Sequence, residues 1–274
     1  MLDLLRLVRA PNLVLAAVGV LAGGWIATGT VALPKLVVFA ALAAVGFGAA
    51  GNALNDIWDQ AADRVNRSPA ERPLAGGRIA RGTADLCVVA GALGGAAAAA
   101  LVSGTALAVG LAALGVMISY SPVLKRRGLL GNVAVALVAG LPLMYGAIAV
   151  GRPAAGVVPW TLAAWIHLVR ELVKDLDDQP GDRALGRRTL PIVLGPRRAG
   201  RVAAALAILF VPVSLALPAA AHYGMAYFLI AIFAQLAVLV VASRLLLERR
   251  DRNAGLLKGA MLLGIVALVA GRVT

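Results

Sequence analysis

Long apolar runs are the feature of this chain that most restricts how it can fold. Nine of them, separated by clusters of charged residues, follow one another along 274 residues. About 20 apolar residues in a helix cross the hydrocarbon core of a bilayer, so each run predicts one membrane span. The predicted spans are 12–29, 36–62, 84–102, 105–123, 129–149, 157–176, 200–218, 223–243 and 255–271. We therefore expect an all-α integral membrane protein, with residues 1–274 forming a single transmembrane domain.

The composition of the spans favours a tight bundle. Ala and Gly dominate several of them, for example residues 91–100, and small residues let helices approach closely in a membrane. Pro34, Pro122 and Gly128 stand where helices are expected to end or turn. The first span lacks a small-residue cleavage site, so we interpret it as a retained helix and not as a signal peptide.

The basic residues predict how the chain is oriented. The formal charge is +13, which in a soluble protein would suggest a nucleic-acid partner. With the N-terminus in the cytoplasm, however, 23 of the 26 Lys and Arg lie on the cytoplasmic side. Only Lys35, Arg152 and Arg272 fall on the other side, a strong bias under the positive-inside rule. We expect a multi-pass protein of the cell membrane, in contact with membrane lipids, with a cytoplasmic N-terminus and no nucleic-acid partner.

Two acidic clusters with the same spacing follow the second and sixth spans. Their members are Asp56, Asp59 and Asp63, and Asp175, Asp178 and Asp182. In each cluster the offsets are 0, +3 and +7. In the first, Asn55, Asp59 and Asp63 are spaced i, i+4 and i+8, which predicts one face of a continuous helix. Asp177 does not fit the shared spacing and is expected to be solvated.

Such clusters suit a divalent cation. Carboxylates one turn apart repel each other, and their desolvation near a membrane is costly unless cations neutralise them. Mg²⁺ prefers one or two carboxylates together with water and substrate phosphates. The clusters therefore indicate a site for a magnesium–diphosphate complex. A solvated acidic helix end is the alternative, but it does not explain why the spacing occurs twice.

Basic residues close to the clusters are candidates for binding phosphate oxygens. Arg72 follows the first cluster, Lys125 follows the fourth span and Lys174 directly precedes the second cluster. For any single basic residue, a role in topology or in contact with anionic lipids is the alternative.

Other residues carry weaker signals. His167 could line a cavity, although a packed core histidine is favoured, and His222 falls in an outer loop. Cys87 is the single cysteine and is interpreted as a small apolar residue. The chain has no Cys-x-x-Cys pair, zinc-ligand spacing, dinucleotide-binding glycine motif or Walker loop.

These motifs resemble those of the UbiA-type intramembrane prenyltransferases. The family motif N-D-x-x-D-x-x-x-D is matched from Asn55 to Asp63, and its D-x-x-x-D motif from Asp178 to Asp182. An early R-x-x-N element is matched by Arg9-Ala-Pro-Asn12. Within the family, residues 170–191 are most similar to the digeranylgeranylglyceryl phosphate synthase branch, which adds a second geranylgeranyl chain to a glycerol phosphate ether.

The resemblance implies a nine-transmembrane-helix bundle whose central cavity opens to the cytoplasmic side, and a Mg²⁺ cofactor. The implied metal ligands are Asn55, Asp56, Asp59, Asp63, Asp175, Asp178 and Asp182. The implied catalytic residues are Asp59, Asp63, Asp178 and Asp182. The candidate substrate-binding residues are Arg9, Asn12, Asn52, Arg67, Arg72, Tyr120, Lys125, Arg170 and Lys174.

The expected activity is transfer of a prenyl group, geranylgeranyl above all, from its diphosphate to the hydroxyl of geranylgeranylglyceryl phosphate. The expected partners are these two substrates and no required protein. An aromatic acceptor, of the 4-hydroxybenzoate or quinone-precursor type, is the alternative within the family. The non-enzymatic alternative is a transporter of an anionic lipid or metabolite, which predicts inverted repeats and helices broken at mid-membrane.

Overall fold

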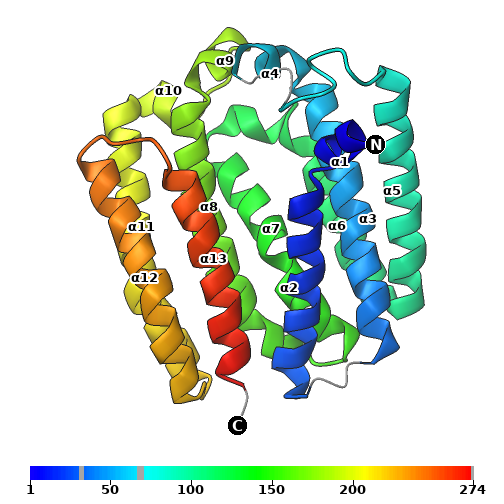
Figure 1. Cartoon of the computed structure of the whole chain (residues 1–274), viewed down its shortest axis with the longest axis vertical. Helices are drawn as coiled ribbons and strands as arrows, with labels where there is room; N and C mark the ends of the chain where they lie inside the picture. The colour runs from blue at the N-terminus through cyan, green and yellow to red at the C-terminus, as the bar shows by residue number, and fades with distance from the viewer. Residues whose placement is uncertain (31–33, 67–70, 273–274) are drawn as a thin grey trace.

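The computed structural model describes residues 1–30, 34–66 and 71–272, and all regular secondary structure in these ranges is helical, as the apolar runs predict (Figure 1). The α-helices are α1 (Leu2–Leu7), α2 (Ala10–Thr28), α3 (Lys35–Trp58), α4 (Gln60–Asn66), α5 (Arg81–Val102), α6 (Gly104–Tyr120), α7 (Leu129–Ala149), α8 (Val157–Asp177), α9 (Gln179–Ala184), α10 (Leu190–Leu194), α11 (Pro196–Ala220), α12 (Met225–Leu246) and α13 (Asn253–Ala270). Two 3-10 helices, η1 (Leu124–Arg127) and η2 (Pro153–Gly156), precede α7 and α8.

Each predicted span coincides with a long helix, and several of the expected breaks lie where the sequence places them. Pro34 caps the start of α3, and Gly128 precedes α7 with a φ of 57°, a conformation that glycine adopts without strain. Ser103 is the only residue between α5 and α6. Its hydroxyl accepts a hydrogen bond from the Ala106 N–H and so caps the start of α6.

The number of membrane crossings stays a prediction. Among the described residues, seven helices are long and apolar enough to span a bilayer, namely α2, α3, α5, α7, α11, α12 and α13. Helix α6 has only 17 residues, and α8 carries five charged residues in its last eight. The protein is therefore a multi-pass membrane protein, whereas nine crossings, the cytoplasmic opening and the cytoplasmic N-terminus rest on the sequence.

The prediction of one continuous helix over 36–62 is wrong. Helix α3 ends at Trp58 and the short helix α4 begins at Gln60, so the chain changes direction at Asp59. The sequence did not reveal this break because no Gly or Pro marks it.

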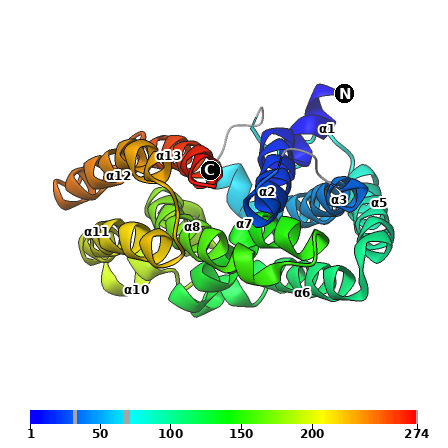
Figure 2. The same cartoon turned by 90° about the horizontal axis from the view of Figure 1, so that it is seen from below.

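Besides a small apolar cluster that joins α1, α3 and α5, the long helices pack around two larger, separate apolar cores. One core draws residues from α2, α3, α5, α6 and α7, and the other from α2, α7, α8, α11, α12 and α13. Helix α7 lies at the seam, because its Tyr145 belongs to the first core and its Leu143 to the second. Seen from below in Figure 2, α7 lies between α3 and α5 on one side and α11 and α12 on the other. This arrangement places a cavity between the two halves.

The short helices α4 and α9 contact each other at one end of the bundle (Figure 1). Each directly follows a long helix, α3 or α8, that carries an aspartate cluster at its end. The contact therefore brings the two clusters, which are 119 positions apart in the sequence, to the same end of the molecule.

Helices α2 and α7 approach so closely that backbone lies against backbone. A Cβ atom added to Gly146 would lie 1.9 Å from the Val20 carbonyl oxygen, and one added to Gly23 would lie 1.9 Å from the Leu143 carbonyl oxygen. Such distances exclude any side chain, as expected for small residues at a helix interface in a membrane.

We predict that Gly146→Ala lowers the stability of the protein by about 1–3 kcal/mol, because the added methyl group forces α2 and α7 apart. Gly94→Ala is the matched control, since a Cβ at this position of α5 meets no atom within 4 Å. Thermal unfolding of both variants in detergent micelles checks the prediction. Equal melting temperatures for the two would contradict it.

Candidate functional site

Both aspartate clusters have the same backbone construction. Asp59 ends α3 with φ −93° and ψ 5°, and Asp178 ends α8 with φ −91° and ψ 3°. In each cluster a backbone hydrogen bond links the junction to the residue four positions later, from Asp63 N–H to the Asp59 carbonyl and from Asp182 N–H to the Asp178 carbonyl. The repeated sequence spacing thus corresponds to a repeated long-helix, junction, short-helix unit.

Two basic side chains join the clusters. Arg187 donates hydrogen bonds to both Asp59 and Asp182, the latter at 3.0 Å. Lys125 Nζ lies 3.7 Å from Asp59 Oδ2 and 3.2 Å from Asp182 Oδ1. Burial alone would lower the pKa of Arg187, but the charges of Asp59 and Asp182 outweigh burial and raise it. Arg187 and Lys125 are therefore charged groups that compensate two buried carboxylates.

Asp56 and Asp63 are compensated separately, by arginines from outside the clusters. Asp56 Oδ1 accepts a hydrogen bond from Arg9 Nη2 at 2.7 Å and another from Arg72 Nη1 at 3.3 Å. Arg72 Nε lies 3.2 Å from Asp63 Oδ2. Burial raises the pKa of the Asp63 carboxyl, and the charge of Arg72 only partly opposes this.

Neutral polar groups hold other members in place. Asn132 of α7 donates a hydrogen bond to Asp175 Oδ2 at 2.8 Å. Asn55 accepts one from the Ser121 hydroxyl at 3.2 Å and donates one to Asp59 at 3.4 Å. These bonds fix the side chains of the two clusters relative to α7 and to the end of α6.

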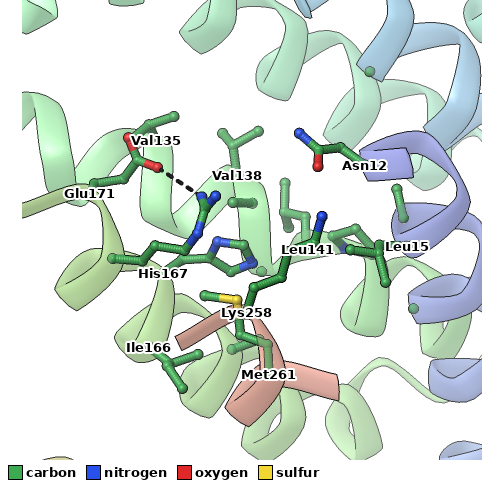
Figure 3. A pocket seen from close by; sticks show the side chains of 18 of the residues that line it. Asn12, Leu15, Val135, Val138, Leu141, Ile166, His167, Glu171, Lys258 and Met261 are labelled. Carbon is green, nitrogen blue, oxygen red and sulfur yellow. Dashed lines mark ion pairs between the residues drawn. The ribbon is translucent and has the colours of Figure 1, made fainter. Parts of the chain in front are cut away.

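A cavity of about 430 Å³ reaches from this polar end into the bundle. Its lining is polar near the aspartates and apolar deeper inside, where Phe47, Val109, Leu162 and Ile265 contribute. Figure 3 shows part of the wall, with apolar side chains such as Val135 and Val138 near Asn12, His167 and Lys258. The cavity can therefore hold a molecule with a charged head and a long apolar chain.

Most of the predicted site residues meet at this cavity. Those that line it are Arg9, Asn12, Asn52, Asn55, Asp59, Asp63, Arg72, Tyr120, Lys125, Arg170, Lys174, Asp175 and Asp178. Asp56 and Asp182 do not line it and are buried behind it, at 2% and 0% exposed. Arg67 lies outside the described residues. Asp177 is exposed, and His167 lines the cavity.

The donor chemistry of the site fits a hard divalent cation. No three Asp, Glu, His or Cys side chains within the described ranges converge closely enough to hold a metal ion, because Lys125 and Arg187 stand between the clusters. Yet buried oxygens of Asp56 and Asp182, each Oδ2, accept no hydrogen bond in the described structure. These oxygens belong to the ligand type that Mg²⁺ prefers.

Several site residues were not singled out from the sequence. Arg187 was one of many basic residues after the second cluster, and nothing in its spacing distinguished it. Asn132 had a usable signal, because a polar residue inside an apolar span requires a partner. Two further residues, Glu171 and Lys258, also line the cavity. Glu171 accepts two hydrogen bonds from Lys174, both at 2.9 Å.

Comparison with known proteins agrees with this geometry. Residues 16–266 match the model of the UbiA prenyltransferase family. The chain belongs to this family. It is 35% identical over 272 residues to the digeranylgeranylglyceryl phosphate synthase of Halobacterium salinarum, covering 98% of this chain and 96% of the relative. The resemblance found from the motifs is thus confirmed, and the protein is a prenyltransferase.

Solved structures of other UbiA homologues have the same fold. The apo structure of a homologue from Aeropyrum pernix K1 is 22% identical, with a TM-score of 0.82 over 94% of this chain and 97% of that one. A homologue from Archaeoglobus fulgidus, bound to GPP and Mg²⁺, is 17% identical, with a TM-score of 0.67 over 98% of both chains.

We predict that Arg187→Met destabilises this UbiA-family protein by about 3–5 kcal/mol, because it removes one of the two cations that Asp59 and Asp182 share and breaks two buried ion pairs. Arg187 is 5% exposed, whereas the neighbouring Arg188 is exposed and provides the control variant Arg188→Met. Thermal unfolding in detergent measures both. If Arg187→Met melts at as high a temperature as Arg188→Met, the role assigned to Arg187 is refuted.

Proposed function

We propose that residues 1–274 act as one transmembrane prenyltransferase domain that transfers a geranylgeranyl group from its diphosphate to the hydroxyl of geranylgeranylglyceryl phosphate. The observation that carries this proposal is the meeting of two aspartate clusters, bridged by Lys125 and Arg187, at the polar end of an apolar cavity. The identity with the Halobacterium salinarum synthase over nearly the whole chain supports this acceptor.

The polar end would bind the diphosphate together with Mg²⁺. Asn55, Asp59, Asp63, Asp178 and Asp182 would hold the metal, with Asp56 and Asp175 assisting. When bound, Mg²⁺ would neutralise the negative charge of the diphosphate and make it a better leaving group. The Archaeoglobus fulgidus homologue bound to GPP and Mg²⁺ supports a prenyl diphosphate and Mg²⁺ as the ligands of this fold.

The basic side chains then serve the bond-breaking step. As the allylic C–O bond breaks, the electron pair goes to the diphosphate, and Lys125 and Arg187 stabilise the developing charge. Arg9 and Arg72 lie at the same end of the cavity and bind the outer phosphate oxygens. The acceptor hydroxyl oxygen forms a new bond to the allylic carbon and passes its proton to the departing diphosphate.

The apolar part of the cavity has two tasks. It accommodates the isoprenoid chain, and it limits the access of water, which would otherwise capture the allylic cation and yield a free alcohol. The charged mouth and the apolar depth therefore act on opposite ends of the same substrate. The cytoplasmic orientation of the mouth, with the N-terminus on the same side, is part of this proposal.

We predict that the purified protein, supplied with Mg²⁺ and radiolabelled geranylgeranyl diphosphate, transfers the label to geranylgeranylglyceryl phosphate. A panel that also contains 4-hydroxybenzoate and a quinone precursor separates the acceptor classes. Transfer to an aromatic ring alone would overturn the acceptor while leaving prenyl transfer intact. A failure to release diphosphate with any acceptor, together with uptake of an anionic lipid into vesicles, would favour a transporter.

We predict that Asp59→Asn and Asp182→Asn each reduce Mg²⁺-dependent turnover by at least about a hundredfold, because each removes a charge that holds the metal–diphosphate complex. These variants keep the side-chain volume. Asp177→Asn is the matched control, since Asp177 is exposed and outside the shared spacing, and it should retain normal turnover. Near-normal turnover in either of the first two variants would remove the aspartates from the mechanism.

A further inference from the structure

The basic residues around the cavity fall into three groups. Arg170 and Lys174 form ion pairs with Glu171. Arg9, Arg72, Lys125 and Arg187 all form ion pairs with aspartates of the two clusters. Lys258 of α13 lines the same cavity but has no ion pair with any carboxylate in the described ranges. A lysine that faces a cavity inside a membrane protein without a counter-charge indicates an anionic ligand.

Lys258 and the basic residues of α8 line the same cavity from two neighbouring helices. Figure 1 places the start of α13 and the end of α8 toward the same end of the bundle, and the two helices pack against each other. Lys258 is five residues from the start of α13 and Arg170 is seven from the end of α8, so both lie about 8–11 Å along their helices. Figure 3 shows Lys258, His167 and Glu171 on the wall of one cavity, with the Lys258 amino group directed toward the side where Asn12 lies.

This group of side chains carries an excess of positive charge. Arg170, Lys174 and Lys258 line this part of the cavity together with two carboxylates, Glu171 and Asp175, which leaves a net charge of +1. Glu171 is engaged mainly by Lys174, at 2.9 Å, whereas Arg170 Nη1 lies 3.7 Å away. Arg170 Nε is buried and donates no hydrogen bond to any described residue. A phosphate monoester carries about −1.5 to −2 at pH 7, and this excess of positive charge would attract it.

An apolar stripe continues from Lys258 along α13. Met261, Ile265 and Leu268 follow it at offsets of 3, 7 and 10, which places them on one helical face, and all of them line the cavity. A ligand whose phosphate contacts Lys258 could therefore lay an isoprenoid chain along this face.

We propose that Lys258 and Arg170 form a second anion subsite, which binds the phosphate of the acceptor lipid apart from the aspartate-rich end that takes the diphosphate. This inference rests on the proposed function, since it assigns a place to the acceptor of that reaction. Lys258 is a binding residue in this scheme. Its contact with the phosphate holds the acceptor while the hydroxyl reaches the allylic carbon.

The test measures the KM of the Lys258→Gln variant for each of its two substrates, in detergent micelles with Mg²⁺. The KM for geranylgeranylglyceryl phosphate should rise about tenfold to a hundredfold, because a charge-assisted hydrogen bond is lost. The KM for geranylgeranyl diphosphate should stay within twofold. Lys258→Arg should restore most of the acceptor affinity. Arg201→Gln, at an exposed position of α11 outside the cavity lining, should change neither KM.

A second measurement uses the acceptor without its phosphate, geranylgeranylglycerol. In Lys258→Gln, kcat/KM for the phosphorylated acceptor divided by kcat/KM for the dephosphorylated acceptor should fall by the same factor as the acceptor affinity. Because both values come from the same preparation, this ratio does not depend on how much of the protein is folded. The subsite proposal is overturned if this ratio is unchanged, or if only the KM for the diphosphate rises. In either case the proposed function stands. If the wild-type protein transfers no prenyl group to the phosphorylated acceptor, both proposals are overturned.

Discussion

The structure depends on the compensation of buried carboxylates at one end of a membrane bundle. Asp59 and Asp182 belong to different halves of the chain, and each interacts with Arg187 and Lys125. A carboxylate with 0% or 5% exposure needs a cation, and two such carboxylates that share two cations link the end of α3 to α9. The same arrangement leaves basic groups at the place where a polyanionic substrate would enter.

Much of the fold could be predicted from the sequence, because hydrophobic periodicity and turn residues are local properties. Each of the nine apolar runs coincides with a helix, and Pro34 and Gly128 stand at helix ends. The break at Asp59 could not be predicted, since a junction with a φ near −93° requires no special residue type. The close contact of α2 and α7 was not visible either, because Gly146 is one of 31 glycines and its partner lies far away in the sequence.

The candidate site was predictable in its acidic part and less so in its basic part. The aspartates share a spacing, and a repeated spacing is informative without any structure. Arg187 is 128 positions from Asp59, and the basic residues after the second cluster also follow the positive-inside rule, which hides their individual roles. Arginine and lysine serve both to orient the protein in the membrane and to bind substrate, so residue type does not separate the two roles. Only the ion pairs distinguish Arg187, which joins two clusters, from Arg188, which is exposed.

The two kinds of positive charge around the cavity differ in what they can do. An arginine that is paired with an aspartate must exchange that aspartate for a phosphate oxygen when the substrate binds. Its contribution to binding is therefore the difference between two strong interactions. A metal ion that binds the released aspartate favours the exchange. An uncompensated lysine loses only water when an anion binds. The aspartate-rich end therefore suits a ligand that arrives with a divalent cation, such as a diphosphate, and the Lys258 side suits an anion that arrives without one. In the proposed reaction, this difference would let one cavity distinguish the two phosphorylated lipids by the charge of their head groups, although their isoprenoid chains are the same.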